Sequence, residues 1–565
     1  MQTAEDTSPD GIIKGSKLPT NTQVLIVGYG PVGATMACLL GRYGVDTVVI
    51  DRAAEMQVMP RAIGMDQEGL RIMQLAGLGE DDFEKLAMNK MHMVSPFFGR
   101  YASFNTAGII NGHARQVMYY QPDLERALRK VVSTHDSVQV FAQTEILNLI
   151  QSEQGVEVGL RGADGQRRVL TAQYVVGADG AASTVRDLIG LGFKGRSYAE
   201  DWLIVDAKRV PYKLRDVDFY CGPGRPGPHI PTVGDRQRWE FMLGPKDNPA
   251  EMEKPEKIRE LLEPWCRAED IEIERKAVYR FHARSCDRYS KGRVFLTGDA
   301  AHITPPFIGQ GLVSGMRDVA NLSWKLKWVL DGNASAAVLE SYDTERRPHA
   351  RAMINLAHFL GHWIMPHTRL KAFLVHGSVR LLRMLPVAGA WMDEAKLKKP
   401  QIFKRGLFRK TLPGKPGGRK SLHPGTFFPQ GLVRQGNNIV LSDDALGDEL
   451  CLVGFGFDPA QHLDTDSLAA WQASGGKVVQ IARRCQYLDR SPDAIEDLTG
   501  VLVPHGAPDG WAAVVRPDKM VLHEGPVTES RRLVAESLEL LQQAAGSTSS
   551  TPFKTTSAKT ISAGS

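Results

Sequence analysis

Three glycines near the start of the chain have the spacing of a dinucleotide-binding loop. Gly28, Gly30 and Gly33 follow a short apolar run and precede a helical pattern. The first permits a tight turn, the second lets the backbone approach a pyrophosphate, and the third lets the helix pack closely on the strand. Asp51 follows the next apolar run, where its carboxylate can accept hydrogen bonds from ribose hydroxyls. The combination predicts a bound dinucleotide; the alternative is a glycine turn in a plain α/β domain.

Two later motifs place an aspartate directly after an apolar run. Asp179 lies in the segment GADG, and Asp299 lies in the segment GDAAH. The second motif continues with Pro305-Pro306 and with the turn Gly309–Gly311, which opens a helical pattern. A helix N-terminus carries partial positive charge and favours an anionic group. His302, at the end of GDAAH, is interpreted as a structural hydrogen-bonding residue and not as a catalytic one.

The elements that must position these motifs alternate between apolar runs and helical patterns. Gln23–Val27 and Thr47–Ile50 are typical of buried parallel strands, and Pro31–Tyr43 between them is helical. Further apolar runs at Tyr174–Val176 and Val294–Thr297 precede the two aspartates. The pattern predicts one α/β domain that contains all three motifs.

The sequence between the second and third motifs has a different pattern. From about 202 to 284 it alternates and contains turn signals such as Gly222-Pro223-Gly224, which predicts an inserted antiparallel sheet. After the third motif the pattern is helical as far as Leu385, and Lys398–Pro424 is a basic linker rich in glycine and proline. Short strands return from Thr426 to Glu529.

The composition is that of an ordinary globular chain and excludes several classes of protein. The 565 residues are 42% hydrophobic and 24% charged, and the net charge of +5 does not favour nucleic-acid binding. No apolar run approaches the roughly 20 residues that span a bilayer, and residues 1–20 lack the apolar core of a secretory signal. The six cysteines form no CxxC pair. We therefore expect no metal site and a reduced, cytoplasmic protein.

Taken together, the three motifs resemble those of the single-component (class A) FAD-dependent aromatic hydroxylases. The resemblance covers roughly residues 23–348. The segments PRAIGMDQEGLR and GLVSGMRDVANLSWKL, with RPD at Arg516–Asp518, are most similar to the branch of 3-(3-hydroxyphenyl)propanoate hydroxylase and phenol hydroxylase. The resemblance implies a Rossmann-like FAD domain of the p-hydroxybenzoate hydroxylase type, an inserted antiparallel β-sheet substrate domain and a C-terminal thioredoxin-like domain.

The expected domain boundaries combine this resemblance with the patterns along the chain. The C-terminal domain lacks CxxC, so we expect a structural or dimerisation role for it and a homodimeric protein. The expected segments are a disordered tail at 1–20, a discontinuous FAD-binding domain at 21–201 and 285–350, a substrate domain at 202–284, a helical segment and linker at 351–424, a thioredoxin-like domain at 425–545 and a disordered tail at 546–565.

The resemblance also implies which residues contact FAD. Arg61 matches an arginine that contacts the cofactor phosphates, Gln121 matches a glutamine that holds FAD from the opposite side, and Asp179 matches an aspartate linked to FAD and the nicotinamide donor. For Arg61 and Gln121 the alternative is a surface salt bridge or a helix cap. We expect non-covalent FAD, because no His or Cys stands in a motif for flavin attachment. The expected cofactor-binding residues are Gly28, Gly30, Gly33, Asp51, Arg52, Arg61, Gln121, Asp179, Asp299, Gly309, Gly311 and Leu312.

The implied reaction is the hydroxylation of a phenol. NADH or NADPH, binding transiently, reduces FAD; O2 adds at flavin C4a to give a hydroperoxide, and the activated ring takes up its distal oxygen. A second GxGxxG match at Gly222–Gly227 is interpreted as a turn, so no dedicated nicotinamide domain is expected. The alternative is an FAD-dependent oxidoreductase that inserts no oxygen.

Residues that contact the substrate are harder to predict. Pro305, with Pro306, matches a rigid wall beside flavin and substrate, while Tyr279 and His282 lie where phenol-type members place pocket residues. Asp66 either reaches the pocket or caps the helix that begins near Glu68. The weaker candidates are Tyr220, His229 and Arg238, and a solvated sheet arginine is the alternative for the last.

The substrate that the resemblance favours is a phenol of the 3-(3-hydroxyphenyl)propanoate type, hydroxylated ortho to give a catechol. A neutral phenol or a larger polycyclic phenol stays open. A buried anionic side chain would need a cationic partner or several N–H groups in the pocket.

Overall fold

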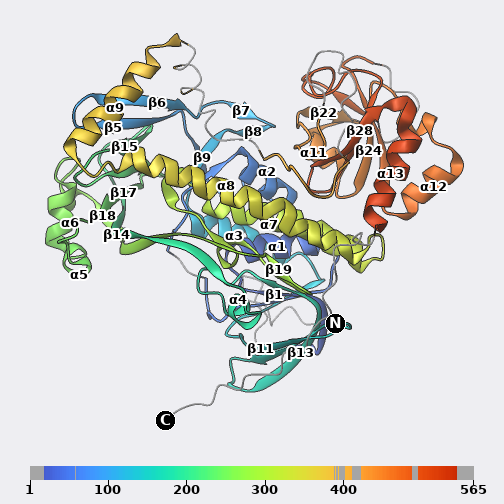
Figure 1. Cartoon of the computed structure of the whole chain (residues 1–565), viewed down its shortest axis with the longest axis horizontal. Helices are drawn as coiled ribbons and strands as arrows, with labels where there is room; N and C mark the ends of the chain where they lie inside the picture. The colour runs from blue at the N-terminus through green and yellow to red at the C-terminus, as the bar shows by residue number, and fades with distance from the viewer. Residues whose placement is uncertain are drawn as a thin grey trace.

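The computed structural model describes residues 18–56, 59–386, 389, 392, 401–409, 422–486 and 494–543. The tails expected at 1–20 and 546–565, apart from residues 18–20, and much of the linker expected at 398–424 lie outside these residues. Figure 1 shows two parts, a larger one that carries the sequence motifs and a smaller C-terminal one.

An eight-stranded sheet forms the centre of the first part. Its parallel strands bring the ends of four apolar runs to one edge, because β1 pairs with both β2 and β13, and β13 pairs with β20. The order is β10 (Val138–Phe141), β2 (Thr47–Ile50), β1 (Asn21–Val27), β13 (Arg167–Gly177), β12 (Val156–Arg161) and β11 (Glu145–Gln151), with β20 (Val294–Leu296) beside β13 and β19 (Ser290–Lys291) beside β20.

Helices cover this sheet and enclose a large apolar core. The buried side chains of β1, such as Leu25 and Ile26, pack with those of α1, such as Met36 and Leu40. The helices of this part are α1 (Pro31–Arg42), α2 (Gln67–Leu75), α3 (Gln121–Val132), α4 (Thr184–Leu188), α7 (Gly311–Leu330) and α8 (Glu340–Ile364). Smaller strands are β3 (Gly64–Asp66), β4 (Lys85–Ala87), β7 (Ile109–Ile110), β8 (His113–Ala114) and β9 (Gln116–Tyr119).

A second eight-stranded sheet lies beside the first. It extends beyond the segment 202–284, because β5 and β6 come from an earlier stretch of chain and β5 pairs in parallel with β15. The order is β21 (His302–Ile303), β18 (Glu272–Cys286), β14 (Phe193–Lys208), β17 (Gln237–Met242), β16 (Gly227–Pro231), β15 (Val217–Tyr220), β5 (Lys90–Ser95) and β6 (Gly99–Asn105). Helices α5 (Pro249–Met252) and α6 (Pro255–Leu262) pack on one face.

The two long strands β14 and β18 connect the two sheets. They pair from Phe193 opposite Cys286 to Lys208 opposite Glu272, and the register shifts between Ser197 and Asp201. The segment from Phe193 to Cys286 therefore enters and leaves the second sheet through one hydrogen-bonded pair of strands.

The C-terminal part contains a seven-stranded mixed sheet. Helices α12 (Thr465–Ala473) and α13 (Ser530–Gln542) pack on it, and α11 (Ser442–Leu446) lies near its edge (Figure 1). The order is β23 (Asn438–Leu441), β22 (Leu432–Gln435), β26 (Ile495–Asp497), β25 (Gly476–Ala482), β24 (Leu450–Phe455), β27 (Trp511–Val515) and β28 (Val521–Pro526). Its likeness to thioredoxin stays a prediction.

A buried charge network joins the C-terminal part to α7 and α8. Arg516 donates to Glu345 on α8 at 2.8 Å and to Asp518 at 2.5 Å, and Lys325 on α7 donates to the same Glu345 at 2.8 Å. Asn321 also donates to Glu345, at 2.6 Å. We call these five residues the Glu345 network. Because its charges alternate in sign and are hydrogen-bonded, it fixes the C-terminal part on the helix that begins at Gly311.

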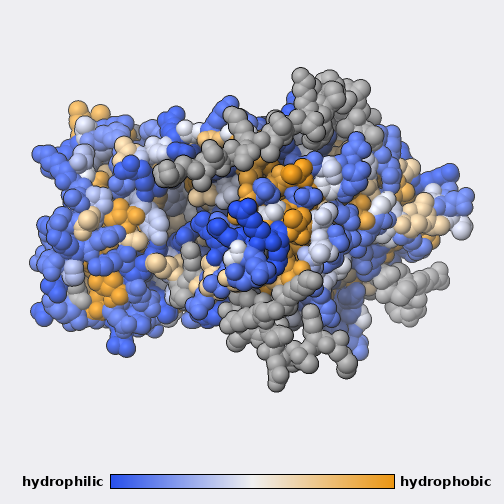
Figure 2. Space-filling view, turned by 90° about the horizontal axis from the view of Figure 1, so that it is seen from below, coloured by the Kyte–Doolittle hydropathy of each residue, from blue (hydrophilic) through white to orange (hydrophobic). Residues whose placement is uncertain are grey.

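The face drawn in Figure 2 is mostly hydrophilic, with smaller apolar patches between. Within the described part of the chain, no helix combines the length and apolar character that crossing a membrane requires.

Candidate functional site

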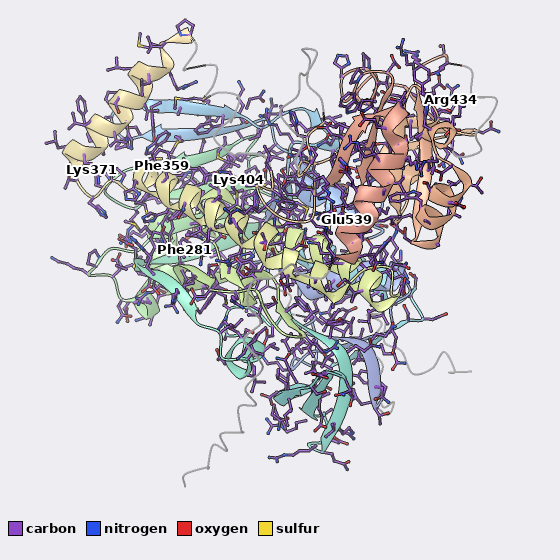
Figure 3. All side chains as sticks on the ribbon, turned by 45° about the vertical axis from the view of Figure 1, so that its right-hand side comes forward. Phe281, Phe359, Lys371, Lys404, Arg434 and Glu539 are labelled. Carbon is purple, nitrogen blue, oxygen red and sulfur yellow. The ribbon has the colours of Figure 1, made fainter. Side chains whose placement is uncertain are left out.

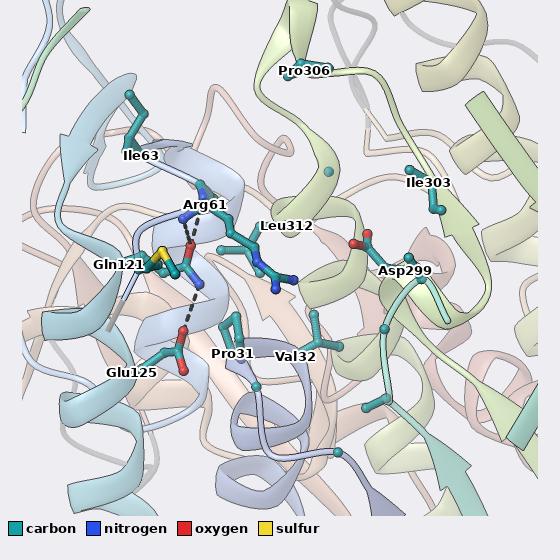
Figure 4. A pocket seen from close by; sticks show the side chains of 18 of the residues that line it. Pro31, Val32, Arg61, Ile63, Gln121, Glu125, Asp299, Ile303, Pro306 and Leu312 are labelled. Carbon is teal, nitrogen blue, oxygen red and sulfur yellow. Dashed lines mark hydrogen bonds between the residues drawn. The ribbon is translucent and has the colours of Figure 1, made fainter. Parts of the chain in front are cut away.

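A cavity of about 700 Å³ lies between the two large sheets. One end is formed by the loop after β1, the ends of β2 and β13 and the start of α7, and the other end by side chains of the second sheet. Figure 4 shows the first end, with Pro31 and Val32 below it and Asp299 and Leu312 beside it. We call this the central cavity.

The glycine loop has the geometry that its sequence predicts. Gly28 has φ +105°, and its N–H donates to Ile50 O at 2.7 Å. A Cβ on Gly33 would lie 1.9 Å from Gly28 O, whereas a Cβ on Gly30 would have no atom within 4 Å. The loop is therefore tight at its first and third glycines and open to the cavity at the second, where α1 begins. This space suits a pyrophosphate at a helix N-terminus.

The carboxylate of Asp51 stabilises this loop. It accepts hydrogen bonds from Tyr29 N and Ala53 N, both at 2.7 Å, and it lines the central cavity at the end of β2. The adjacent Arg52 is exposed and also lines the cavity.

Gln121 holds the backbone that carries Arg61. Its side-chain oxygen accepts from Arg61 N at 2.8 Å and from Ala62 N at 2.7 Å, while its amide nitrogen donates to Glu125 at 2.7 Å (Figure 4). Burial raises the pKa of the Glu125 carboxyl. The Arg61 side chain is exposed and extends toward the side of the cavity where Asp299 lies (Figure 4).

Two aspartates face the cavity from the ends of β13 and β20. Asp179 accepts from Ser183 Oγ at 2.5 Å and from Val185 N at 3.0 Å, so it also caps α4. No described group donates a hydrogen bond to the Asp299 carboxyl, and burial raises its pKa even though His302 and Arg61 lower it. A carboxyl that is exposed to the cavity and accepts no hydrogen bond from the described residues fits the hydroxyl groups of a bound cofactor.

The helix predicted after the third motif begins at Gly311 and its N-terminus borders the cavity. Gly309 has φ +61°, and Gly309, Gly311 and Leu312 all line the cavity. His302 Nε2 donates to one Asp318 oxygen at 2.6 Å, and Arg346 donates to the other oxygen of that carboxylate at 2.9 Å. His302 therefore has the structural hydrogen bond expected of it.

The structure brings only part of the predicted site together. Tyr279 accepts a hydrogen bond from Arg275, His282 lies at 2.8 Å from Ser197 Oγ, and Asp66 caps α2 by accepting from Glu68 N and Gly69 N. The residues predicted for the site that do not line the cavity are Gly33, Asp66, Tyr279, His282 and Pro305, with the weaker candidates Tyr220 and His229. Pro306, the neighbour of Pro305, does line it.

The residues that sequence reasoning missed form the apolar end of the cavity. They come mainly from alternate positions on the second sheet, and Phe281, labelled in Figure 3, is one of them. Alternation along these strands was the available signal, but the sequence does not say which of the two faces meets the cavity. The apolar lining consists of Ile63, Met91, Met118, Trp202, Val217, Phe219, Pro228, Ile230, Phe281, Ile303, Phe307 and Ile364.

Two charged groups, Arg238 and Glu240, interrupt this apolar end. Arg238 donates to both oxygens of Asp206 at 2.6 and 2.9 Å, and to Pro60 O and Arg61 O at 2.8 and 2.9 Å. It is therefore a buried structural residue and not the solvated sheet arginine that was the alternative. Glu240 has no hydrogen bond from any described group.

Comparisons with known proteins agree with this geometry. Residues 21–357 match the family model described as FAD binding domain, and residues 425–540 match the model described as HcaD C-terminal domain. The 3-(3-hydroxy-phenyl)propionate/3-hydroxycinnamic acid hydroxylase of Burkholderia cenocepacia is 36% identical over 514 residues, which are 88% of this chain and 93% of that protein. The Escherichia coli K12 protein of the same name is 32% identical over 512 residues, 89% and 91% of the two chains.

Solved structures share the fold at lower identity. The flavin-dependent monooxygenase PieE, solved with FAD and substrate, gives a TM-score of 0.76 at 20% identity and covers 92% of this chain and 99% of its own. Aklavinone-11 hydroxylase, solved with FAD and aklavinone, gives a TM-score of 0.71 at 23% identity. The match covers 93% of this chain and 100% of that one.

The family match and the relatives thus place this chain among FAD-binding flavoprotein monooxygenases, and its fold is of the p-hydroxybenzoate hydroxylase type. The chain belongs to the family of single-component FAD-dependent aromatic hydroxylases. The fold class and the family predicted from the motifs are confirmed.

Replacing Asp299 by alanine should weaken FAD binding at least about tenfold, because a hydrogen bond to a charged acceptor contributes about 1.5–3 kcal/mol. FAD content after gel filtration, measured by absorbance, tests this. Asp331→Ala, at the exposed C-terminal end of α7, is the control and should keep its flavin. Equal flavin in both variants would remove Asp299 from the cofactor site.

Proposed function

We propose that this protein hydroxylates a meta-substituted phenol of the 3-(3-hydroxyphenyl)propanoate type at the ortho position. The observation that carries the proposal is the central cavity, in which an FAD-type loop and an apolar chamber share one space. The names of the relatives at 32–36% identity support the substrate class.

The proposed roles of the chain's residues are binding, orientation and exclusion of water. Bound FAD supplies the redox chemistry and the activation of oxygen. Apolar walls such as Trp202, Phe281 and Phe307 keep water from the reacting ring, which limits the wasteful release of hydrogen peroxide. The residues proposed to contact FAD all line the cavity: Gly28, Gly30, Asp51, Arg52, Arg61, Gln121, Asp179, Asp299, Gly309, Gly311 and Leu312.

A neutral phenol is the second candidate substrate, and the state of Arg238 favours it. Its guanidinium already binds Asp206 and two backbone carbonyls, so a substrate carboxylate could not pair with it without displacing them. A buried carboxylate without a cation is unfavourable by several kcal/mol. Arg61, which is exposed, lines the cavity and is also proposed to contact FAD, is one cation that an acidic side chain could reach.

The test compares 3-(3-hydroxyphenyl)propanoate with its methyl ester and with 3-ethylphenol. Each is added to the holoenzyme with NADH or NADPH, and nicotinamide oxidation, oxygen uptake and product mass are recorded. We expect substrate-stimulated oxidation and a product heavier by one oxygen. Faster turnover of the neutral compounds than of the acid would move the assignment to a neutral phenol. Stimulated oxidation without oxygen in any product would identify an oxidoreductase that inserts none.

We further propose that the protein is a cytoplasmic homodimer. All six cysteines lie in the described residues and form no disulfide, which supports a reducing compartment. Helix α9 (Arg369–Arg383) exposes Leu370, Phe373, Leu374 and Leu381, an apolar surface of the kind that subunit contacts cover.

A further inference from the structure

Glu240 is a buried carboxyl that, together with Arg238, interrupts the apolar end of the central cavity. Its side chain is 10% exposed and lines the cavity. On β17 it stands opposite Ile204, while the next residues on either side, Trp239 and Phe241, point to the other face and pack with α6. Strand alternation therefore directs Glu240 at the space where an aromatic ring fits.

No described group donates a hydrogen bond to this carboxyl. The nearest cation is Arg238, whose Nη1 is 3.8 Å from a Glu240 oxygen and whose other nitrogens bind Asp206 and the backbone of Pro60 and Arg61. Buried polar groups without partners are rare and costly, and a carboxyl that lines a cavity can obtain the missing donor from a bound ligand.

We propose that Glu240 accepts the hydrogen bond of the substrate's phenolic hydroxyl and takes its proton during hydroxylation. This rests on the proposed function. In the step, the phenol O–H bond breaks, the proton passes to a Glu240 oxygen, and the electron pair stays on the phenol oxygen, where it activates the ring. When the product ring becomes aromatic again, the hydroxylated carbon loses its hydrogen as a proton to water, and Glu240 returns its proton to the former phenol oxygen, which restores the carboxylate.

The charges around Glu240 suit a proton acceptor. Burial raises the pKa of its carboxyl, Arg238 on its own strand and Arg275 on β18 lower it, and Asp206 on β14 raises it. Proton transfer is most efficient when the pKa of the acceptor lies near the working pH. The pKa of an exposed glutamate is lower, so such a residue is a weaker acceptor for the proton of a phenol.

The first experiment separates hydrogen bonding from packing. The holoenzyme is titrated without NAD(P)H, and ligand binding is followed by the change in flavin absorbance. The probes are 3-ethylphenol and 3-ethyltoluene. The second carries a methyl group of similar size at the position where the first carries its hydroxyl. The wild type should bind the phenol about tenfold more tightly than the toluene, and Glu240→Leu should reduce this ratio to about one. A ratio that Glu240→Leu leaves within threefold of the wild type overturns the proposal.

The second experiment tests the proton transfer. Glu240→Gln keeps the shape and one acceptor oxygen but cannot take the proton, so the hydroxylation rate at saturating phenol should fall about 100-fold or more while flavin content and the phenol Kd change little. A rate equal to that of the wild type overturns the proposal. Glu251→Gln, exposed on α5, is the matched control and should behave as the wild type.

The two proposals fail in different ways. If the wild type hydroxylates no phenol, the proposed function fails and this inference fails with it. If the wild type forms a hydroxylated product and the Glu240 variants keep both the binding ratio and the rate, the function stands and only the role of Glu240 is wrong.

Discussion

Replacing Arg516 by methionine is expected to lower the free energy of unfolding by about 3–5 kcal/mol. Arg516 is fully buried and donates to Glu345 and Asp518, so its removal leaves carboxylates with too little compensating charge. Although burial opposes ionisation, Arg516 and Lys325 lower the pKa of Glu345 to about 2, so that carboxyl is charged at neutral pH. Urea unfolding of the holoenzyme, followed by flavin release and by circular dichroism, measures the loss.

Arg532→Met is the matched control for this variant. Arg532 pairs with Glu529 and Glu536 on the surface of α13, where such pairs contribute about 0–1 kcal/mol. A similar loss of stability in both variants would contradict the assigned importance of the Glu345 network. The Glu345 network holds the C-terminal part against α8, because Arg516 and Asp518 come from that part and Glu345 comes from α8.

Gly33→Ala is expected to remove FAD binding and to destabilise the fold. Its Cβ would lie 1.9 Å from Gly28 O, so α1 and the loop would have to move apart. Overpacking of this kind costs about 1–3 kcal/mol or more, and the backbone that faces the pyrophosphate moves as well. Flavin content and the urea midpoint of the flavin-free protein are the two measurements.

Gly30→Ala separates the loss of FAD binding from the loss of fold stability. A Cβ there meets no atom within 4 Å, so the flavin-free protein should unfold at the wild-type midpoint, whereas its FAD affinity should fall because the methyl enters the cofactor space. If Gly33→Ala retained both flavin and stability, the close packing of α1 on the loop would not matter for binding.

The local parts of this fold could be predicted from sequence because their signals are local. Thr47–Ile50 is observed as β2 at the predicted bounds, and α1 begins at Pro31 as expected. Spacing also predicted the cofactor loop, since Gly28 and Gly33 meet within six residues of chain.

Features that depend on distant pairing could not be predicted. His282 was expected at the substrate, yet it is the adjacent Phe281 that lines the cavity, because neighbouring strand residues point to opposite faces. The segment RPD was recognised only as a similarity. Its physical basis is a contact between Arg516 and Glu345, 171 residues apart, which no local pattern reveals.

The construction of the second sheet decides how such enzymes could exchange their substrate-binding parts. The ends of the segment 193–286, on β14 and β18, are hydrogen-bonded neighbours about 5 Å apart, so the two chain junctions of a graft between relatives would lie side by side. However, β15 pairs with β5, which belongs to residues 90–95. A transplant of 193–286 alone would pair β5 of the recipient with β15 of the donor protein. The second sheet therefore consists of three pieces of sequence, 90–105, 193–286 and β21, and recombination that respects this fold must preserve the pairing among them.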